Sequence, residues 1–165
     1  MMTLKDVLVA TDFGEASASA LAYGRELARR FSATLHVVHV VDDLNTRVSL
    51  ASGLPVDIGH MQVDLEARLR LDLKALVTDE DRRDLRAETV LLTSAVPAAA
   101  IAWYAKEKAI GLIVMGTHGR GPVAHLFMGS VAERVVRTAT CPVLTVHHPE
   151  REFLQPDALV KVANA

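Results

Sequence analysis

Four glycines lie in one short segment of this chain, GTHGRGPVAHLFMGS, which spans residues 116–130. The segment follows an apolar run, LIVM, and precedes VAERVVRT, which has the pattern of a helix. A glycine-rich junction of this kind has two interpretations. It is either a tight connection with no further purpose, or a surface on which main-chain N–H groups can reach an anion, because glycine has no Cβ to keep the anion away.

The end of this segment opens the predicted helix. Ser130 and Glu133 form the S-x-x-E pattern of a capping box, which predicts that the Ser130 hydroxyl accepts the N–H of Glu133. Capping leaves the N–H groups of Ser130, Val131 and Ala132 free at the positive end of the helix dipole, where an anion is favoured. Gly129 would let a phosphate approach this turn. Ser130 is therefore a candidate both for the helix cap and for a phosphate ligand.

The start of the segment offers further contacts. Gly116 and Gly119 would permit positive φ immediately after the preceding strand. His118 and Arg120 would add hydrogen-bond donors, with a charge in the case of Arg120. An exposed arginine in a loop is often only solvated, so a contact role for Arg120 is one of two interpretations.

Asp12 stands at the end of another apolar run, DVLVA. Its carboxylate could orient a ribose hydroxyl, hold a metal ion through water, or cap the helix that follows. A phosphoacceptor receiver domain is excluded, because that chemistry needs an aspartate after the third strand, where Thr93-Ser94-Ala95 stands. His36 and His39 are three apart in a strand and point to opposite faces, so they cannot chelate one metal together. No HExxH, CxxC, GxSxG or GxxxxGK[ST] pattern is present.

Short β-branched runs alternate with longer segments of helical period, and this alternation predicts a parallel sheet covered by helices on both faces. We expect strands at 6–10, 35–41, 89–93, 112–115 and 142–146, and helices at 15–31, 61–77, 97–108 and 131–138. Ligands of such open α/β sheets bind beyond the carboxyl ends of the strands. The predicted site residues lie at or after such ends.

One domain is expected to span residues 1–148, followed by a tail at 149–165. The connection 42–60 is rich in loop-forming residues, which predicts a lid or a disordered loop. The segment 79–84 is expected to be a charged turn.

The formal net charge of −2 argues against a general electrostatic footprint for nucleic acid. The single cysteine fits a reducing compartment, and no segment approaches the length of a membrane span. We therefore expect a cytoplasmic protein that binds neither nucleic acid nor membrane.

The glycine spacing resembles a known signature. Gly116-x-x-Gly119, nine residues and then Gly129-Ser130 are similar to the G-2x-G-9x-G-[S/T] motif of the nucleotide-binding branch of the universal stress proteins. VLVATDF near the start and GSVAERVVRTATCPVLTV after the motif strengthen the resemblance, which covers roughly residues 4–147.

The resemblance implies a Rossmann-like fold with a five-stranded sheet of order 3-2-1-4-5 and an ATP site. Thr11 and Asp12 would face the ribose and phosphates, and the backbone of Val40 or Val41 would contact adenine. The remaining residues implied for the ribose and phosphates are Met115, Gly116, His118, Gly119, Gly129, Ser130 and Val131. The resemblance also implies a homodimer through the strand 142–146, whose outer edge would otherwise be unpaired.

The resemblance implies an adenine-nucleotide-binding stress-response sensor or regulator. Backbone cradles are expected, but no general base or arginine clamp is placed for an efficient enzyme. Slow ATP hydrolysis is expected at most, with Mg²⁺ recruited through water by Asp12. The alternative is a partner-binding stress protein of the same fold that uses no nucleotide.

Overall fold

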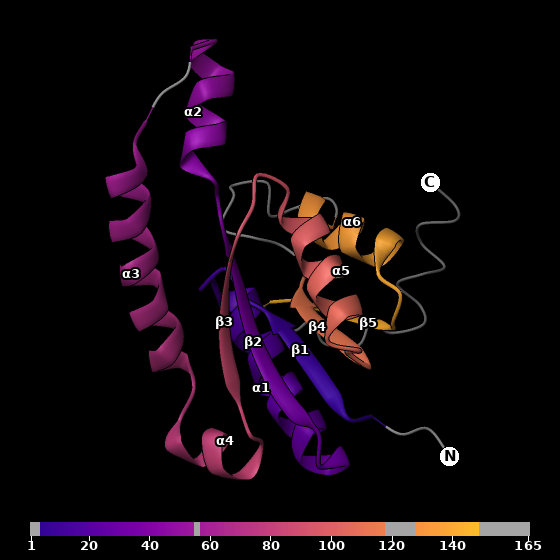
Figure 1. The fold of residues 1–165 in the computed structure, drawn as a ribbon. Helices are drawn as coiled ribbons and strands as arrows, with labels where there is room; N and C mark the ends of the chain where they lie inside the picture. Colours follow the sequence, from indigo (N-terminus) through magenta and orange to yellow (C-terminus); the bar gives the residue numbers. More distant parts are fainter. Residues whose placement is uncertain (1–3, 55–56, 118–127, 149–165) are drawn as a thin grey trace, which may run out of the picture.

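The computed structural model describes residues 4–54, 57–117 and 128–148. They form a single five-stranded sheet of order β3-β2-β1-β4-β5, in which every adjacent pair of strands is parallel (Figure 1). The strands are β1 (Asp6–Ala10), β2 (Thr34–Val41), β3 (Glu88–Thr93), β4 (Leu112–Gly116) and β5 (Val143–Val146). The helices are α1 (Glu15–Phe31), α2 (Leu44–Ser52), α3 (Gly59–Leu76), α4 (Asp79–Asp84), α5 (Pro97–Glu107) and α6 (Ser130–Thr138). The predicted α/β fold and strand order are confirmed.

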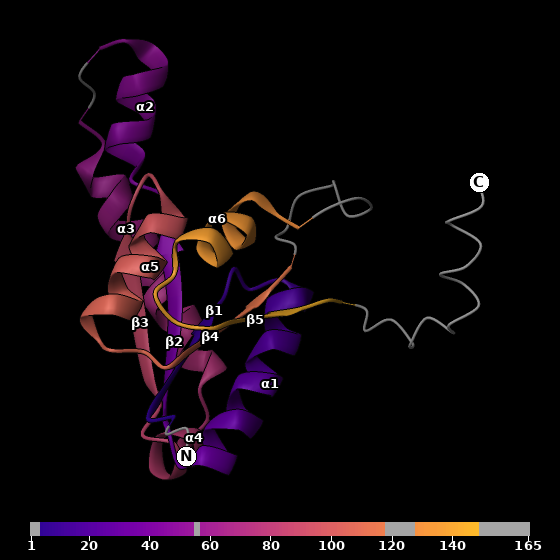
Figure 2. The ribbon, with the colours of Figure 1, turned by 90° about the vertical axis from the view of Figure 1, so that its right-hand side faces the viewer.

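The sheet separates two apolar cores, as continuous apolar strands require. Val7 and Val9 face the core that contains residues of α1 and α3, whereas Leu8 faces the core that contains residues of α5 and α6. All three side chains are fully buried. Figure 2 shows α1 and α5 on opposite sides of the sheet.

Strand β1 lies at the point where the direction of winding reverses. Ala10, its last residue, is opposite Val38 of β2 on one side and Met115 of β4 on the other. The carboxyl ends of β2, β1 and β4 therefore lie side by side. This is the part of an open α/β sheet where ligands bind.

The connection 42–60 is not the loop that its composition predicts. It contains α2, which stands beyond the carboxyl edge of the sheet beside the start of α3 (Figure 1). Asp43 caps α2 by accepting the N–H of Thr46 at 3.0 Å, and Gly53 ends it with φ 69°. These two terminal residues are ordinary helix signals that outweigh the serines and asparagine between them.

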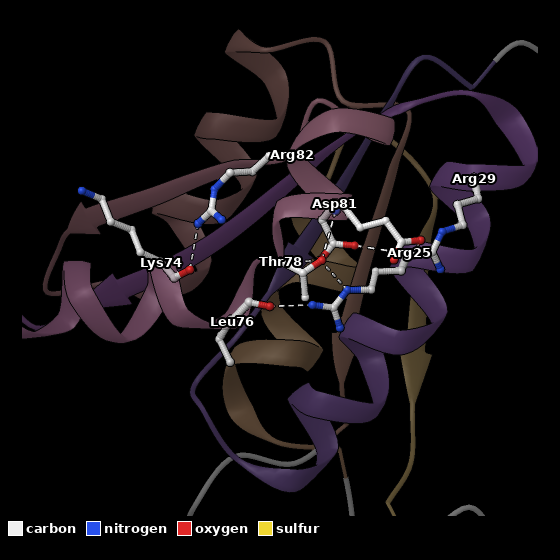
Figure 3. A network of polar contacts seen from close by, with 8 residues as sticks. Arg25, Arg29, Lys74, Leu76, Thr78, Asp81 and Arg82 are labelled. Atoms are coloured by element: carbon white, nitrogen blue, oxygen red, sulfur yellow. Dashed lines mark hydrogen bonds and ion pairs between the residues drawn. The ribbon is translucent and has the colours of Figure 1, made fainter.

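The predicted charged turn 79–84 is the short helix α4, which an ion pair between Arg25 and the buried Asp81 carboxylate attaches to α1 (Figure 3). Asp81 is only 1% exposed, and its Oδ2 accepts Nε–H of Arg25 at 2.9 Å and N–H of Thr78 at 3.1 Å. Arg29 Nη2 lies 3.7 Å from the other carboxylate oxygen. Burial alone would raise the pKa of Asp81, but the hydrogen bonds from Thr78 and Arg25 outweigh it and lower that pKa.

No helix in the described ranges is both long and apolar enough to cross a membrane.

Candidate functional site

The turn between β1 and α1 is held by its own side chains. Thr11 is buried, and its Oγ1 accepts the N–H of Phe13 at 3.0 Å and lies 3.1 Å from the Ser17 hydroxyl. Ser17 in turn donates to the carbonyl of Gly14 at 2.9 Å. The Thr11 hydroxyl therefore organises the turn from within.

Asp12 follows at the rim of this turn and is half-buried. Its Oδ1 accepts the N–H of Gly14 at 2.9 Å. The interpretation of Asp12 as the cap of α1 is wrong, because the residue at the cap position is Gly14 and the helix begins at Glu15. The Asp12 carboxylate closes a local turn instead, one step ahead of the helix.

Phe13 has φ 64°, a left-handed conformation that is rare for a large side chain. Its ring packs against the imidazole of His39 on β2, with centroids 4.7 Å apart. The Nδ1 of His39 lies 2.7 Å from the carbonyl oxygen of Thr11. Backbone strain of this kind concentrates at functional sites.

Met115 and Gly116 end β4 beside this turn. Met115 is buried in the core under α5 and α6. A Cβ on Gly116 would lie 2.8 Å from the Cβ of Ala16 and 2.9 Å from its carbonyl carbon. The expectation that Gly116 supplies a positive φ is wrong, since Gly53 is the only glycine of the described residues in that region. Glycine is required here because the first turn of α1 packs directly on β4.

Thr117 follows β4 and is hydrogen-bonded to the end of β5 and to Gly129, the residue before α6. It is 1% exposed, and its N–H donates to the carbonyl of Val146 at 2.9 Å. Its own carbonyl accepts the N–H of Gly129 at 2.6 Å, and its hydroxyl lies 3.0 Å from Nδ1 of His147. The two ends of the glycine-rich segment are therefore bonded to each other.

Helix α6 starts directly after this bond. Its cap position is Gly129, and the N–H of Glu133 donates to the Gly129 carbonyl at 2.9 Å. The prediction that the Ser130 hydroxyl caps the helix is wrong, because Ser130 is already the first helical residue and makes no side-chain cap bond. The N–H groups of Ser130, Val131 and Ala132 have no partner within the helix, as at any helix start.

Val40 and Val41 end β2, next to β1. Val41 is buried, and its carbonyl accepts the N–H of Ser94 at 3.0 Å. A hollow of about 470 Å³ opens beside this strand end, between α2 and the connection from β3 to α5. It is lined by Asp42, Asp43, Arg47, Leu50, Ala51 and Ala95.

Charge in this hollow is largely paired. Arg47 forms an ion pair with Asp42. Hydrogen bonds from the hydroxyl and N–H of Thr46 hold the pKa of Asp43 below its ordinary value. The wall of the hollow is thus acidic at Asp42 and Asp43 and apolar at Leu50 and Ala51 of α2.

The structure brings most of the predicted residues to one edge: Thr11, Asp12, Val40, Val41, Met115, Gly116, Gly129, Ser130 and Val131 follow or end β1, β2 and β4 or begin α6. His118, Gly119, Arg120 and the tail 149–165 lie outside the described residues. Within the described ranges, no cluster of three or more His, Cys, Asp or Glu side chains is arranged to hold a metal ion.

Three residues of this edge were not predicted as part of the site. They are Phe13, His39 and Thr117. A polar residue near the carboxyl end of a buried strand was the available signal for His39 and Thr117. Nothing in the sequence distinguishes a phenylalanine with positive φ.

Comparisons with known proteins agree with this geometry. The universal stress protein family model matches residues 3–147. The chain belongs to the universal stress protein family. It is 33% identical over 150 residues to the universal stress protein MJ0531 of Methanocaldococcus jannaschii, and the match covers 90% of this chain and 85% of that protein.

Solved structures of universal stress proteins share the fold of this one. Protein MJ0577 of Methanocaldococcus jannaschii superimposes with a TM-score of 0.69 at 20% identity, over 91% of this chain and 100% of that chain. A universal stress protein of Archaeoglobus fulgidus in complex with dAMP gives a TM-score of 0.60 at 23% identity, over 88% and 99% of the two chains. A further universal stress protein, in complex with cAMP, gives 0.62 at 22% identity, over 88% and 98%. Adenine nucleotides therefore bind to some structural relatives of this chain.

Proposed function

We propose that this universal stress protein binds ATP at the carboxyl edge of its sheet and acts as a stress-response sensor or regulator. The observation that carries the proposal is the position of α6. The Gly129–Thr117 bond places its first turn at the end of β4, next to the point where the winding reverses. The N–H groups there favour an anion such as a phosphate.

Two findings at Ser130 and Gly129 support a phosphate at this turn. The Ser130 hydroxyl is not used as a cap, so it remains a donor for a phosphate oxygen. Gly129 has no Cβ at the cap position. His118, Gly119 and Arg120 follow β4 in the chain, and we include them in the proposed phosphate and ribose contacts, together with Met115, Gly116 and Val131.

The base would lie toward β2. The hollow beside Val41 has the size range of small-molecule sites, and its apolar wall suits a base. Thr11 and Asp12 would lie between base and phosphates, at the end of β1. Complexes of structural relatives with dAMP and cAMP support adenine as the base.

Asp12 is the residue we propose to hold Mg²⁺ through water. Gly14 occupies one of its carboxylate oxygens. Magnesium would neutralise phosphate charge, but no general base is placed beside it. We therefore propose slow hydrolysis at most, and expect Asp12→Asn to lower any turnover while ATP still binds.

We also propose a homodimer through β5. This strand is at one edge of the sheet, so its outer backbone groups are positioned for pairing with a second copy.

A charge test at the start of α6 checks the ATP proposal. Asp and Asn are both good helix caps, so Gly129→Asp and Gly129→Asn should fold alike. Only the aspartate places a negative charge where the phosphate would bind. By titration calorimetry we expect ATP binding in the wild-type chain, weaker binding in Gly129→Asn, whose side chain obstructs the approach of the phosphate, and loss of binding in Gly129→Asp.

Titration with ATP, ADP and AMP at protein concentrations well above ~100 μM tests whether a nucleotide binds. A Kd of ~100 μM corresponds to a binding free energy near −5.5 kcal/mol. No heat with any of the three, and no nucleotide retained in mass spectra of the gently purified protein, would favour the partner-binding alternative. Equal affinity in Gly129→Asp and Gly129→Asn would place the phosphates elsewhere.

A further inference from the structure

His39 contacts the β1–α1 turn on both sides of Asp12. Its Nδ1 lies 2.7 Å from the carbonyl oxygen of Thr11, and its ring packs on that of Phe13. A carbonyl oxygen only accepts hydrogen bonds, so Nδ1 of His39 carries the proton. The histidine therefore holds the residue before Asp12 by its backbone and the residue after it by its side chain.

The bond from His39 sets the direction of the peptide group that Thr11 and Asp12 share. A peptide is planar and trans, so its C=O and N–H point in opposite directions. The Thr11 carbonyl points toward β2, where His39 is. The N–H of Asp12 must then point the other way, toward β4.

The strand ladder gives the same direction independently. The N–H of Thr11 donates to the carbonyl of Val38 on β2 at 2.9 Å. Successive residues of a strand direct their backbone groups to alternate neighbours, so those of Asp12 face β4. Pairing between β1 and β4 ends at Ala10 opposite Met115. Among the described residues, none accepts a hydrogen bond from the Asp12 N–H.

Phe13 has a strained backbone conformation in this turn. Its φ of 64° lies in the left-handed region, which is strained for a large side chain. The hydrogen bond from its N–H to Thr11 and the packing against His39 hold it there.

We infer that His39 is a positioning residue, which aims the Asp12 N–H toward the end of β4 as a donor to an anionic or hydroxyl group of the nucleotide. This inference rests on the proposed function. It gives a side chain of β2 an indirect role in the phosphate–ribose contacts.

Two substitutions separate the hydrogen bond from the packing. His39→Asn places an amide N–H near the position of Nδ1 and retains the donor to Thr11 without the ring. His39→Phe retains an aromatic ring against Phe13 without the donor. We expect His39→Phe to weaken ATP binding about tenfold, the loss of one hydrogen bond, and His39→Asn to stay within about threefold of the wild-type chain.

A spectroscopic measurement follows the Asp12 N–H itself. In NMR spectra, we expect ATP to shift the Asp12 amide proton downfield in the wild-type chain and in His39→Asn, but not in His39→Phe. A purely structural histidine would lower the urea midpoint in both variants and leave the ATP-induced shift in place. If His39→Phe does not fold, His39→Gln serves instead, because its amide reaches the position of Nε2 rather than Nδ1.

Wild-type binding distinguishes the two levels of failure. No ATP binding by the wild-type chain overturns the proposed function and this inference with it. Binding by the wild-type chain with the same affinity and the same Asp12 shift in His39→Phe overturns the inference alone. Equal weakening in His39→Asn and His39→Phe also overturns it, because the ring and not the donor would then matter.

Discussion

The backbone N–H of Gly129 donates to the carbonyl oxygen of Thr117 at 2.6 Å, so the end of β4 and the start of α6 are held next to each other. Thr117 is in turn attached to Val146 at the end of β5. The start of α6 is therefore located by the sheet. This is the physical basis of the proposal that an anion binds at this helix terminus, beside the ends of β1 and β4.

The Thr117–Gly129 bond can be removed with little change of backbone shape. Gly129 has φ −59°, which proline also adopts, but proline has no N–H. We expect Gly129→Pro to lower the free energy of unfolding by about 1–2 kcal/mol and to weaken ATP binding. Gly129→Ala retains the N–H and should keep the free energy of unfolding near that of the wild-type chain. Urea unfolding and calorimetry measure the two effects, and identical behaviour of the two variants would mean that the bond does not locate α6.

Gly116 is expected to tolerate no side chain. The Cβ of Gly116→Ala would lie within 3 Å of two atoms of Ala16, one of them backbone. Either β4 or the start of α1 must shift, which typically costs about 1–3 kcal/mol. At Gly59, a Cβ would meet only a carboxylate oxygen of Asp57, at 3.2 Å, so Gly59→Ala is the matched control. Equal urea midpoints for both variants would contradict the close packing of α1 on β4.

Asp81 should make stability depend on pH in a defined window. Its pKa in the folded protein is lowered, chiefly by hydrogen bonds from Thr78 and Arg25 that outweigh the opposing effect of burial. A carboxyl with a lowered folded pKa stabilises the fold above its unfolded pKa, near 3.9. That contribution is lost as the pH falls through the folded pKa. Asp81→Asn should thus cost on the order of 3 kcal/mol at pH 7, and the cost should shrink below about pH 4.

Glu26 supplies the control for this measurement. Its ion pair with Arg30 is exposed on α1, with 77% and 58% of the arginine and glutamate side chains accessible. Exposed pairs contribute about 0–1 kcal/mol, so Glu26→Gln should change little at any pH. Urea unfolding between pH 3 and pH 8 compares the variants. A pH-independent cost for Asp81→Asn would show that its charge is not what stabilises α4.

The proposed dimer can be tested at its edge strand. Leu144 lies in β5 and is 37% exposed. A carboxylate at this position in both copies would be desolvated and repelled in a paired edge, so Leu144→Glu should be a monomer in light scattering. Leu71→Glu is the control, since Leu71 is 67% exposed on α3. A wild-type chain with the mass of one copy would rule out the dimer at the concentration used.

The fold was predictable because its signals are local and repeated. Apolar runs such as DVLVA and LIVM, each followed by a helical period, predict buried parallel strands with helices on both faces. The exception was α2. There, the loop-forming residues inside the segment predicted a loop, although Asp43 and Gly53 at its ends are helix signals.

The candidate site was predictable only as a set of positions. Residues after the ends of neighbouring parallel strands must come together, so Asp12, Gly116 and Ser130 could be assigned to one edge from their order in the chain. What each of them does there was not predictable. Ser130 matched a capping box and is not a cap, because Gly129 takes that position in the folded chain.

By itself, the sequence determined the alternation of strands and helices and the family, whose resemblance implied the strand order, and it assigned the candidate site to the carboxyl edge. Only the tertiary structure decided the individual roles: α1 packing accounts for Gly116, a contact from β2 sets the Thr11–Asp12 peptide, and the end of β4 anchors Gly129. The physical reason is the range of the interactions. Propensity and periodicity act between residues a few positions apart, whereas these roles depend on atoms that only folding brings into contact.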